Sequence, residues 1–292
     1  MRTRLAVLAV PLALGLSGLA AVAGCAPAEE EAAPASPSAS GGCSPEGLGT
    51  LEAGTLTVAT SEPAYEPWVV EDDPASGEGY ESAVAYAVAE QLGYAQDDVT
   101  WVRADFNAAI QPGPKTFDVD VNQFSISPER AEAVDFSTSY YDVTQAVVTT
   151  ASSPAASAAS LADLVGLRLG AQVGTTSLTA ITDTIDPNTA PAVYNSNDDA
   201  VLALQNGQVD ALVVDLPTAF YMAGAQLDDG TVVGQLPSGA GGQGESFGMV
   251  LEKDSALTGC VSAAVDALRE DGTLAELQER WLSDVAEAPV LQ

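Results

Sequence analysis

The sequence predicts an α/β fold, because segments that read as β-strands alternate with segments that read as helices from Gly54 onward. The strand-like segments are short and apolar, which is typical of buried, mostly parallel sheets. About 245 residues remain after an N-terminal leader and a polar stretch are set aside, enough for two parts with cores of their own.

The first half of this region alternates three strands with one clear helix. The expected strands cover 55–60, 99–102 and 117–121. Between the first two, residues 81–92 predict a helix with Val84, Val88 and Leu92 on one face and Gly93 as the stop.

The second half continues in the same way. Strands are expected over 167–171, 211–214 and 247–251. Helices are expected from Thr176 or Ser177, both good N-caps, over 199–205 with Gly207 as the stop, and twice near the C-terminus, around Val261, Val265 and Leu268 and around Leu274, Leu277 and Trp281.

The N-terminus has the features of a secretory signal. Arg2 and Arg4 precede an apolar run over 5–23, and small residues precede Cys25. The end of the run, Val-Ala-Gly-Cys, resembles the lipobox of bacterial lipoproteins, which implies a signal peptide over 1–25 and a lipidated Cys25. An uncleaved N-terminal anchor, or a plain signal with a chance cysteine, is the alternative. Residues 26–44, rich in Pro, Ser, Gly and Glu, are expected to form a disordered tether.

Charge and composition exclude several classes of function. The chain has 9 basic and 41 acidic residues, a formal charge of −32, so a nucleic acid is not expected as a partner. The absence of histidine excludes Ser-His-Asp and Cys-His catalysis and every metal site that uses histidine. We expect no enzyme activity and no cofactor.

Three cysteines are present. If Cys25 carries lipid, Cys43 and Cys260 remain as a pair in an oxidising compartment, where a disulfide is the default expectation. Two separate thiols are the alternative.

Two tempting motifs fail on their context. Residues 239–244 satisfy G-x-G-x-x-G but lead into a strand instead of opening a helix, so we expect a loop there. Asp118, Asp120, Asn122 and Glu129 match calcium-loop spacing, but the glycine that the loop needs is replaced by Gln123. We expect no metal site.

The segment Asn-Gln-Phe-Ser-Ile-Ser-Pro-Glu-Arg at 122–130, followed by Ala-Val-Asp-Phe-Ser at 133–137 and by Tyr140-Tyr141, resembles the amino-acid-binding proteins of ABC importers, the polar amino acid branch of the periplasmic-binding superfamily. The resemblance extends from about Leu51 to Leu282. It implies a two-lobed, type II periplasmic-binding-protein-like fold joined by a two-segment hinge. Lobe 1 is expected over 45–139 and 250–286, lobe 2 over 145–244, and the hinge near 140–144 and 245–249.

The resemblance assigns Arg130 and Ser125 to the α-carboxylate of a free amino acid. A planar guanidinium holds a carboxylate in a two-pronged pair, and a hydroxyl adds a donor. The alternative for Arg130 is an ion pair on a helix surface. Gln123 stands where the family usually has a small residue, so its long side chain is expected to reshape the pocket.

In lobe 2, Thr175 and Thr176 match the turn of the family that receives the same carboxylate at a helix N-terminus. An ordinary strand-to-helix turn is the alternative. Asp215 ends an apolar strand, where a charge is costly unless paired, and the resemblance pairs it with the α-ammonium.

Tyr65 and Phe106 match the aromatic residues that clamp the ligand side chain in the family, and a core role is the alternative. Trp68 is expected to pack beneath the first of these loops. Glu62 would suit a cationic or amide side chain, whereas an acidic ligand would need Arg103 as a second cation. A basic or polar amino acid is therefore favoured.

The predicted protein is an extracytoplasmic, lipid-anchored monomer that delivers an amino acid to the membrane permease of an ABC importer. One alternative is a dehydratase-like enzyme on the same fold, with Glu62 or Glu81 as its acid. Another is a ligand-sensing module, for which a transmembrane helix would be expected after Leu282.

Overall fold

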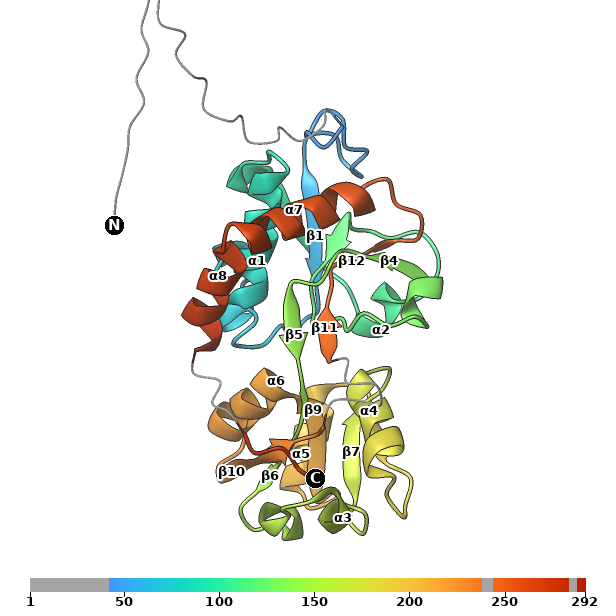
Figure 1. The fold of residues 1–292 in the computed structure, drawn as a ribbon, viewed down its shortest axis with the longest axis vertical. Coiled ribbons are helices and arrows are strands. Elements are labelled where there is room, and N and C mark those ends of the chain that lie inside the picture. The colour runs from blue at the N-terminus through green and yellow to red at the C-terminus, as the bar shows by residue number, and fades with distance from the viewer. Residues whose placement is uncertain (1–41, 238–243, 284–287) are drawn as a thin grey trace, which may run out of the picture. The chain divides into compact units, whose positions relative to one another are not determined.

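The computed structural model describes residues 42–237, 244–283 and 288–292, and within them the chain forms two five-stranded sheets and a two-stranded ribbon (Figure 1). The first sheet has the order β2-β1-β3-β12-β4. Its strands are β1 (Leu56–Thr60), β2 (Val99–Arg103), β3 (Val119–Asp120), β4 (Val134–Phe136) and β12 (Val250–Glu252). β1 is parallel to β2 and β3, whereas β12 is antiparallel to β3 and β4.

One face of this sheet is covered by three helices, α1 (Tyr80–Gln91), α7 (Thr258–Glu270) and α8 (Thr273–Leu282). Figure 1 shows α7 and α8 beside α1, although more than 160 residues separate them in sequence. The face of α1 predicted from sequence, Val84, Val88 and Leu92, is buried in their common core. The short helix α2 (Phe106–Ala109), Ala59 of β1, Val134 of β4 and Val250 of β12 contribute to a second, smaller core on the other face. This sheet and its helices are called the first α/β unit below.

The second sheet has the order β10-β6-β9-β7-β8. Its strands are β6 (Gln145–Thr150), β7 (Leu169–Gln172), β8 (Ala192–Tyr194), β9 (Ala211–Asp215) and β10 (Gly230–Gln235). Its two faces are covered by α3 (Leu161–Leu164) and α4 (Thr176–Ala180) on one side and by α5 (Asn197–Gln205) and α6 (Leu216–Tyr221) on the other. This sheet and its helices are called the second α/β unit.

Short turns of 3-10 or π helix complete the pattern, at Val70–Asp72, Pro74–Ser76, Gln96–Asp98, Arg130–Glu132, Pro154–Ser157, Ile181–Ile185 and Met222–Gln226.

The two units are joined by an antiparallel ribbon of β5 (Tyr141–Val143) and β11 (Glu245–Phe247), which Figure 1 shows between the two sheets. Glu245 is paired with Val143, one residue before the chain enters the second unit at Thr144 and Gln145. Both strands lie within the segments in which the sequence predicts a hinge.

Several sequence expectations need correction. The sheets are mixed rather than mostly parallel, because β12, β6 and β10 return antiparallel to their neighbours. The strand expected over 247–251 is divided into β11 and β12 at Gly248, where a Cβ would collide with Ile126 and with the carbonyl of Ser137. The helix expected from Thr176 or Ser177 does begin at Thr176, but its N-cap is neither of these residues; it is Thr175, whose hydroxyl accepts a hydrogen bond from the Leu178 amide.

The N-terminal end of the described chain is held to the first unit. The structure has the predicted disulfide between Cys43 and Cys260, with Cα atoms 5.5 Å apart, and the carbonyl of Ser44 accepts hydrogen bonds from two following amides. Residues 43 and 44, the last two of the tether predicted over 26–44, therefore take part in these contacts, while its residues 26–41 and the predicted signal peptide lie outside the described residues.

No helix of the described residues is long and apolar enough to span a bilayer. The same residues contain no group of acidic or cysteine side chains able to hold a metal ion. The would-be calcium ligand Asp118 instead accepts hydrogen bonds from the amides of Leu51 and Thr57 at 2.8 Å.

The C-terminal segment 288–292 lies on the second unit, although α8 belongs to the first (Figure 1). The Gln235 amide donates to the carbonyl of Pro289, and the Leu291 amide donates to the carbonyl of Gln235, both at 2.8 Å. Leu291 is only 1% exposed within the core beside β10. Gly234 allows this approach, because a Cβ there would meet Pro289 and Leu291.

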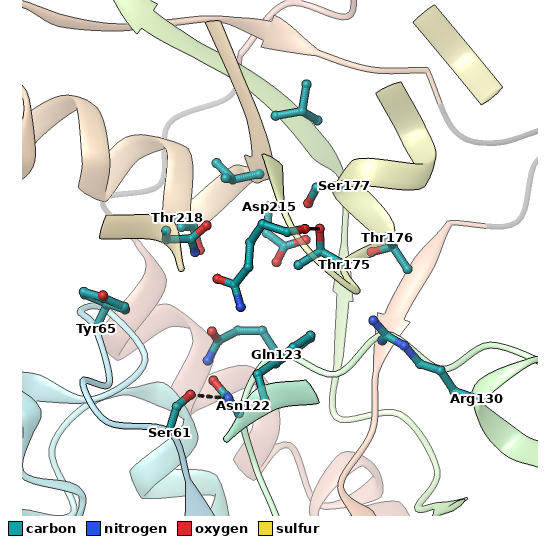
Figure 2. Close-up of a pocket in the computed structure, with 15 residues that line it drawn as sticks. Ser61, Tyr65, Asn122, Gln123, Arg130, Thr175, Thr176, Ser177, Asp215 and Thr218 are labelled. Atoms are coloured by element: carbon teal, nitrogen blue, oxygen red, sulfur yellow. Dashed lines mark hydrogen bonds between the residues drawn. The ribbon is translucent and has the colours of Figure 1, made fainter. Parts of the chain in front are cut away.

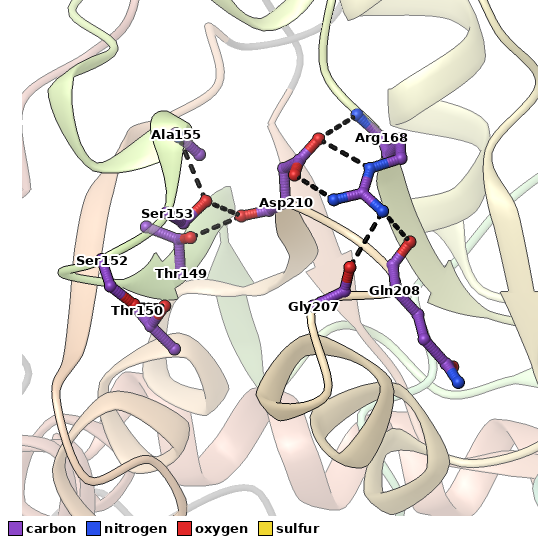
Figure 3. A network of polar contacts seen from close by, with 9 residues as sticks. All are labelled: Thr149, Thr150, Ser152, Ser153, Ala155, Arg168, Gly207, Gln208 and Asp210. Carbon is purple, nitrogen blue, oxygen red and sulfur yellow. Dashed lines mark hydrogen bonds and ion pairs between the residues drawn. The ribbon is translucent and has the colours of Figure 1, made fainter.

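A polar network lies at the N-terminal ends of β7 and β9 (Figure 3). The Arg168 guanidinium forms an ion pair with Asp210, and its backbone amide donates to the same carboxylate at 2.8 Å. The carbonyl of Asp210 accepts hydrogen bonds from the hydroxyls of Thr149 and Ser153. This arginine is therefore committed to holding the second sheet together.

Candidate functional site

A cleft lies where the C-terminal ends of β1 and β3 face those of β7 and β9 (Figure 2). Side chains after the ends of parallel strands are the usual ligand contacts of open α/β sheets. Seven of the nine predicted ligand-binding residues line this pocket: Tyr65, Phe106, Gln123, Arg130, Thr175, Thr176 and Asp215. The other residues that line it are Ser61, Asn122, Gln172, Ser177, Asn197, Val213, Val214 and Thr218.

Arg130 reaches across the cleft from the first unit to the second. Its guanidinium donates to the carbonyl of Ser125 at 2.8 Å and to the carbonyl of Gly174 at 2.9 Å. It also lies 5.7 Å from the centre of the Phe106 ring. These contacts fix the guanidinium within the pocket and leave N–H groups for a bound anion.

The side-chain ion pairs of the described residues belong to other cations. Arg103 pairs with Asp72 at 2.7 Å, Arg168 with Asp210 and Lys253 with Asp135. Arg130 has no carboxylate within ion-pair distance among the described residues, which argues against the alternative of a surface ion pair. Because Arg103 is also bound to the carbonyls of Ser61 and Asp72, it is not available as the second cation that an acidic ligand would need.

Asp215 ends β9 opposite the first unit. Its carboxylate accepts a hydrogen bond from the side-chain amide of Gln145 at 2.8 Å. Burial, assisted by the nearby Glu245 carboxylate, raises the pKa of Asp215 to about 7, although the Gln145 hydrogen bond and Arg130 oppose this shift. A cation that binds beside Asp215 therefore stabilises the ionised form of its carboxylate.

Gln123 is held by a carboxylate beneath the pocket. Its backbone has φ of 48°, and its amide donates to Glu81 at 2.7 Å, while its side-chain amide donates to the other oxygen of Glu81. Glu81 is fully buried and also accepts a hydrogen bond from the Tyr140 hydroxyl. Burial raises the pKa of Glu81 to about 7 against these hydrogen bonds. Glu81 therefore supports the pocket floor through Gln123 and does not line the pocket itself.

Two aromatic residues, Tyr65 and Phe106, also line the pocket. Phe106 is stacked on Phe124 with ring centres 4.9 Å apart, and Tyr65 faces Tyr221 of the second unit at 6.2 Å. Trp68 is buried beneath the first loop, as predicted, and its indole N–H donates to the hydroxyl of Thr218 at 3.2 Å.

Two predicted residues lie elsewhere. Ser125 is 2% exposed behind the pocket, where its hydroxyl is 3.0 Å from Glu245 and 3.1 Å from the Thr176 hydroxyl. Glu62 lines an adjoining hollow with Arg103, Asn195 and Ser196. That hollow shares Tyr65, Phe106 and other residues with the main pocket, so Glu62 lies in a space next to the main pocket.

The sequence reasoning missed several polar residues of the pocket, among them Ser61, Asn122, Gln172 and Thr218. A signal was available for the first three, because Ser61 follows β1, Asn122 follows β3 and Gln172 ends β7. In Figure 2 the side-chain amide of Asn122 donates to the hydroxyl of Ser61 across the ends of β1 and β3.

Residues 56–284 match the model of the bacterial extracellular solute-binding proteins, family 3. The chain is 30% identical to an L-arginine-binding protein of Pseudomonas aeruginosa over 233 residues, which cover 76% of this chain and 86% of the relative. It is also 30% identical to the L-cystine-binding protein TcyJ of Escherichia coli over 241 residues, 79% of this chain and 83% of the relative. Among solved structures, an ancestral arginine-binding protein bound to arginine is similar with a TM-score of 0.64 and 29% identity, over 78% of this chain and 98% of that protein. These relatives are named as binding proteins, which agrees with the expectation of a binding protein instead of an enzyme.

Proposed function

The chain belongs to the bacterial extracellular solute-binding proteins of family 3, and from this premise we propose that it binds a free amino acid for uptake by an ABC importer. The observation that carries the proposal is the pair of opposite charges in the cleft, Arg130 from the first unit and Asp215 from the second. A zwitterion presents a carboxylate and an ammonium that both lose water on binding, and each needs a partner of opposite charge.

In the proposed binding mode the α-carboxylate pairs with the guanidinium of Arg130 and the α-ammonium with Asp215. Thr175 and Thr176 border the carboxylate position from the second unit, and Gln123 borders it from the first. Ser125 contributes through its carbonyl, which holds the Arg130 guanidinium at 2.8 Å. Its hydroxyl would reach the ligand only by leaving Glu245.

The proposed ligand has a basic or polar side chain. Tyr65 and Phe106 offer aromatic faces to an aliphatic or cationic chain. Glu62 lines the adjoining hollow, and the charge of Arg103, which also lines it, is neutralised by Asp72. The arginine-binding relatives support this choice, while the cystine-binding relative shows that the family accepts other side chains.

We further propose that the two units act as the predicted lobes, 45–139 with 250–286 and 145–244, and that the β5–β11 ribbon is their hinge. Because the proposed ligand contacts both units, its binding energy would favour the closed arrangement. The contacts of Arg130 with Gly174 and of Trp68 with Thr218 support such closure, since both cross the cleft. The closed form is what the permease would recognise.

Attachment to the outer face of the cell membrane is proposed through a lipid on Cys25, which lies outside the described residues. The description of the family as extracellular solute-binding proteins supports a location outside the cytoplasm and, with it, an export signal. Cys25→Ser should release the protein into the medium, as measured by fractionation. Retention of the variant in the membrane fraction would show that the apolar N-terminus stays as an anchor.

The ligand is tested by a thermal-shift panel of the twenty amino acids plus ornithine and citrulline, followed by calorimetry. We expect L-arginine or another basic or polar amino acid to raise the melting temperature most, by the mass-action stabilisation of the folded state. If none of these compounds binds, the proposed function is wrong.

A further inference from the structure

Glu245 lies at the hinge end of the cleft and is held by both units at once. Its carboxylate accepts one hydrogen bond from the Ser125 hydroxyl of the first unit and one from the Gln145 side-chain amide of the second, both at 3.0 Å. Glu245 itself belongs to β11, one of the two strands that connect the units. A single carboxylate therefore joins the first unit, the second unit and their connection.

The Gln145 amide is shared between two carboxylates. The hydroxyl of Ser177 donates to its oxygen at 2.6 Å, which fixes the amide with its NH2 group toward the cleft. That nitrogen lies 2.8 Å from Asp215 and 3.0 Å from Glu245. The two acceptor oxygens therefore cannot be more than about 6 Å apart, close enough for like charges to repel strongly. Gln145 is 5% exposed and both carboxylate residues are half-buried, so water screens this repulsion only in part.

The other groups that face Asp215 do not remove this excess of negative charge. Arg130 is the cation among them, Glu81 is a further buried carboxyl from α1, and Tyr141 of β5 is a neutral phenol. Burial and the negative charge of Asp215 raise the pKa of Tyr141 to about 12, so it stays protonated at neutral pH. An ammonium group that arrives beside Asp215 relieves the repulsion directly.

We propose that Glu245 is a positioning residue of the ammonium subsite that joins the two units at the hinge. Through the shared Gln145 amide and its nearby charge, it makes ligand capture displace a proton from Asp215. The inference rests on the proposed function, since the displacing group is the α-ammonium of an amino acid. The proton passes to solvent, and the ammonium takes its place beside the carboxylates.

The sign of the pH dependence follows from linkage. In the empty site the pKa of Asp215 is raised to about 7. The ammonium lowers that pKa in the complex, so the complex binds fewer protons than the free protein and acid favours the free protein. Affinity should change little between pH 8 and pH 8.5 and should fall by up to about tenfold for each pH unit below 7 until the pKa of Asp215 in the complex is reached.

The test is calorimetry between pH 5 and pH 8.5 on the full chain, with L-arginine as the probe, or with the tightest-binding amino acid of the panel if it is another. Glu245→Gln keeps the shape and both hydrogen-bond positions but removes the charge. The decline of its affinity should begin about one pH unit lower than in the wild type. Glu245→Ala also removes the acceptor and should bind roughly tenfold more weakly at pH 8, where Asp215 is ionised.

Asp183→Asn is the matched control, because Asp183 lines the same hollow as Glu245 but has no hydrogen bond with Gln145 or Asp215 among those of the described residues. It should keep the wild-type pH profile. A wild-type affinity that does not change between pH 8 and pH 5, or identical profiles for the wild type and Glu245→Gln, would overturn the inference while leaving amino-acid binding intact.

A second measurement does not depend on the ligand. Carboxyl-detected NMR titration of the ligand-free protein should find Asp215 with a raised pKa in the wild type and a lower one in Glu245→Gln. If the titration of Asp215 is the same in the variant and the wild type, the coupling between Glu245 and Asp215 is refuted, whether or not an amino acid binds. If no amino acid of the panel binds, that result by itself refutes the proposed function and leaves the coupling to be judged from the titration.

Discussion

Arg130 is the cation that lines the pocket, and it has no ion-pair partner among the described residues. Its replacement therefore removes the positive charge that is available to a ligand. Arg130→Met keeps most of the side-chain volume and the contact with Phe106 but loses the guanidinium. It thereby loses the proposed partner of the ligand carboxylate and the two hydrogen bonds to Ser125 and Gly174, at 2.8 and 2.9 Å. Truncating one member of a buried, hydrogen-bonded charge pair costs about 2–5 kcal/mol. Affinity should therefore fall by roughly 30-fold to several thousand-fold.

Calorimetry with the amino acid that the wild type binds best measures this loss. Arg280→Met is the matched control, because Arg280 lies on α8 over the ring of Trp281 and away from the cleft. The control should bind like the wild type, and both variants should melt within a few degrees of it. Near-wild-type affinity of Arg130→Met would refute the assignment of the carboxylate partner.

Three further predictions concern the other anchor and the stability of the fold. Asp215→Asn should weaken the binding of every α-amino acid by about 30-fold or more, as measured by calorimetry. If the variant binds with normal affinity but no longer discriminates among side chains, the ligand lies in the opposite orientation. Reduction of the Cys43–Cys260 disulfide, which closes 217 residues, should lower the free energy of unfolding by up to about 5 kcal/mol while ligand affinity stays the same, and an unchanged melting temperature would contradict this. Leu291→Ala should lower the free energy of unfolding, measured with denaturant, by about 2–3 kcal/mol, since the buried leucine fixes the C-terminal segment. Val290→Ala, at an exposed position, should lower it by under about 0.5 kcal/mol. Equal effects of the two substitutions would show that the segment does not pack on the second unit.

The elements that the sequence predicts best are those whose pattern is local. The 81–92 helix has its apolar face at a spacing of four residues and a glycine at its end, and α1 follows this closely. In the motif over 122–130, Arg130 follows β3 by a short, fixed number of residues. Its position at the cleft is therefore determined by local sequence. These features need no knowledge of what packs against them.

The features that the sequence misses depend on partners far away in the chain. The run 247–251 reads as one strand, yet Gly248 lies against Ile126 and Ser137 and divides it into β11 and β12. Nothing in the sequence around Arg103 indicates its acidic partner, but in the structure it forms an ion pair with Asp72, 31 positions away. Ser125 and Glu245 meet across 120 positions, and nothing near either residue indicates that pairing.

The central claim is that the cleft recognises both charged ends of a free amino acid, and blocked analogues test it most directly. Calorimetry would compare L-arginine, or the tightest-binding amino acid of the panel, with its methyl ester and its Nα-acetyl derivative. The ester lacks the charge that Arg130 is proposed to bind, and the acetyl derivative lacks the charge proposed for Asp215. We predict that each analogue binds at least about 30-fold more weakly than the free amino acid. Equal affinity of either analogue and the free amino acid would contradict the account.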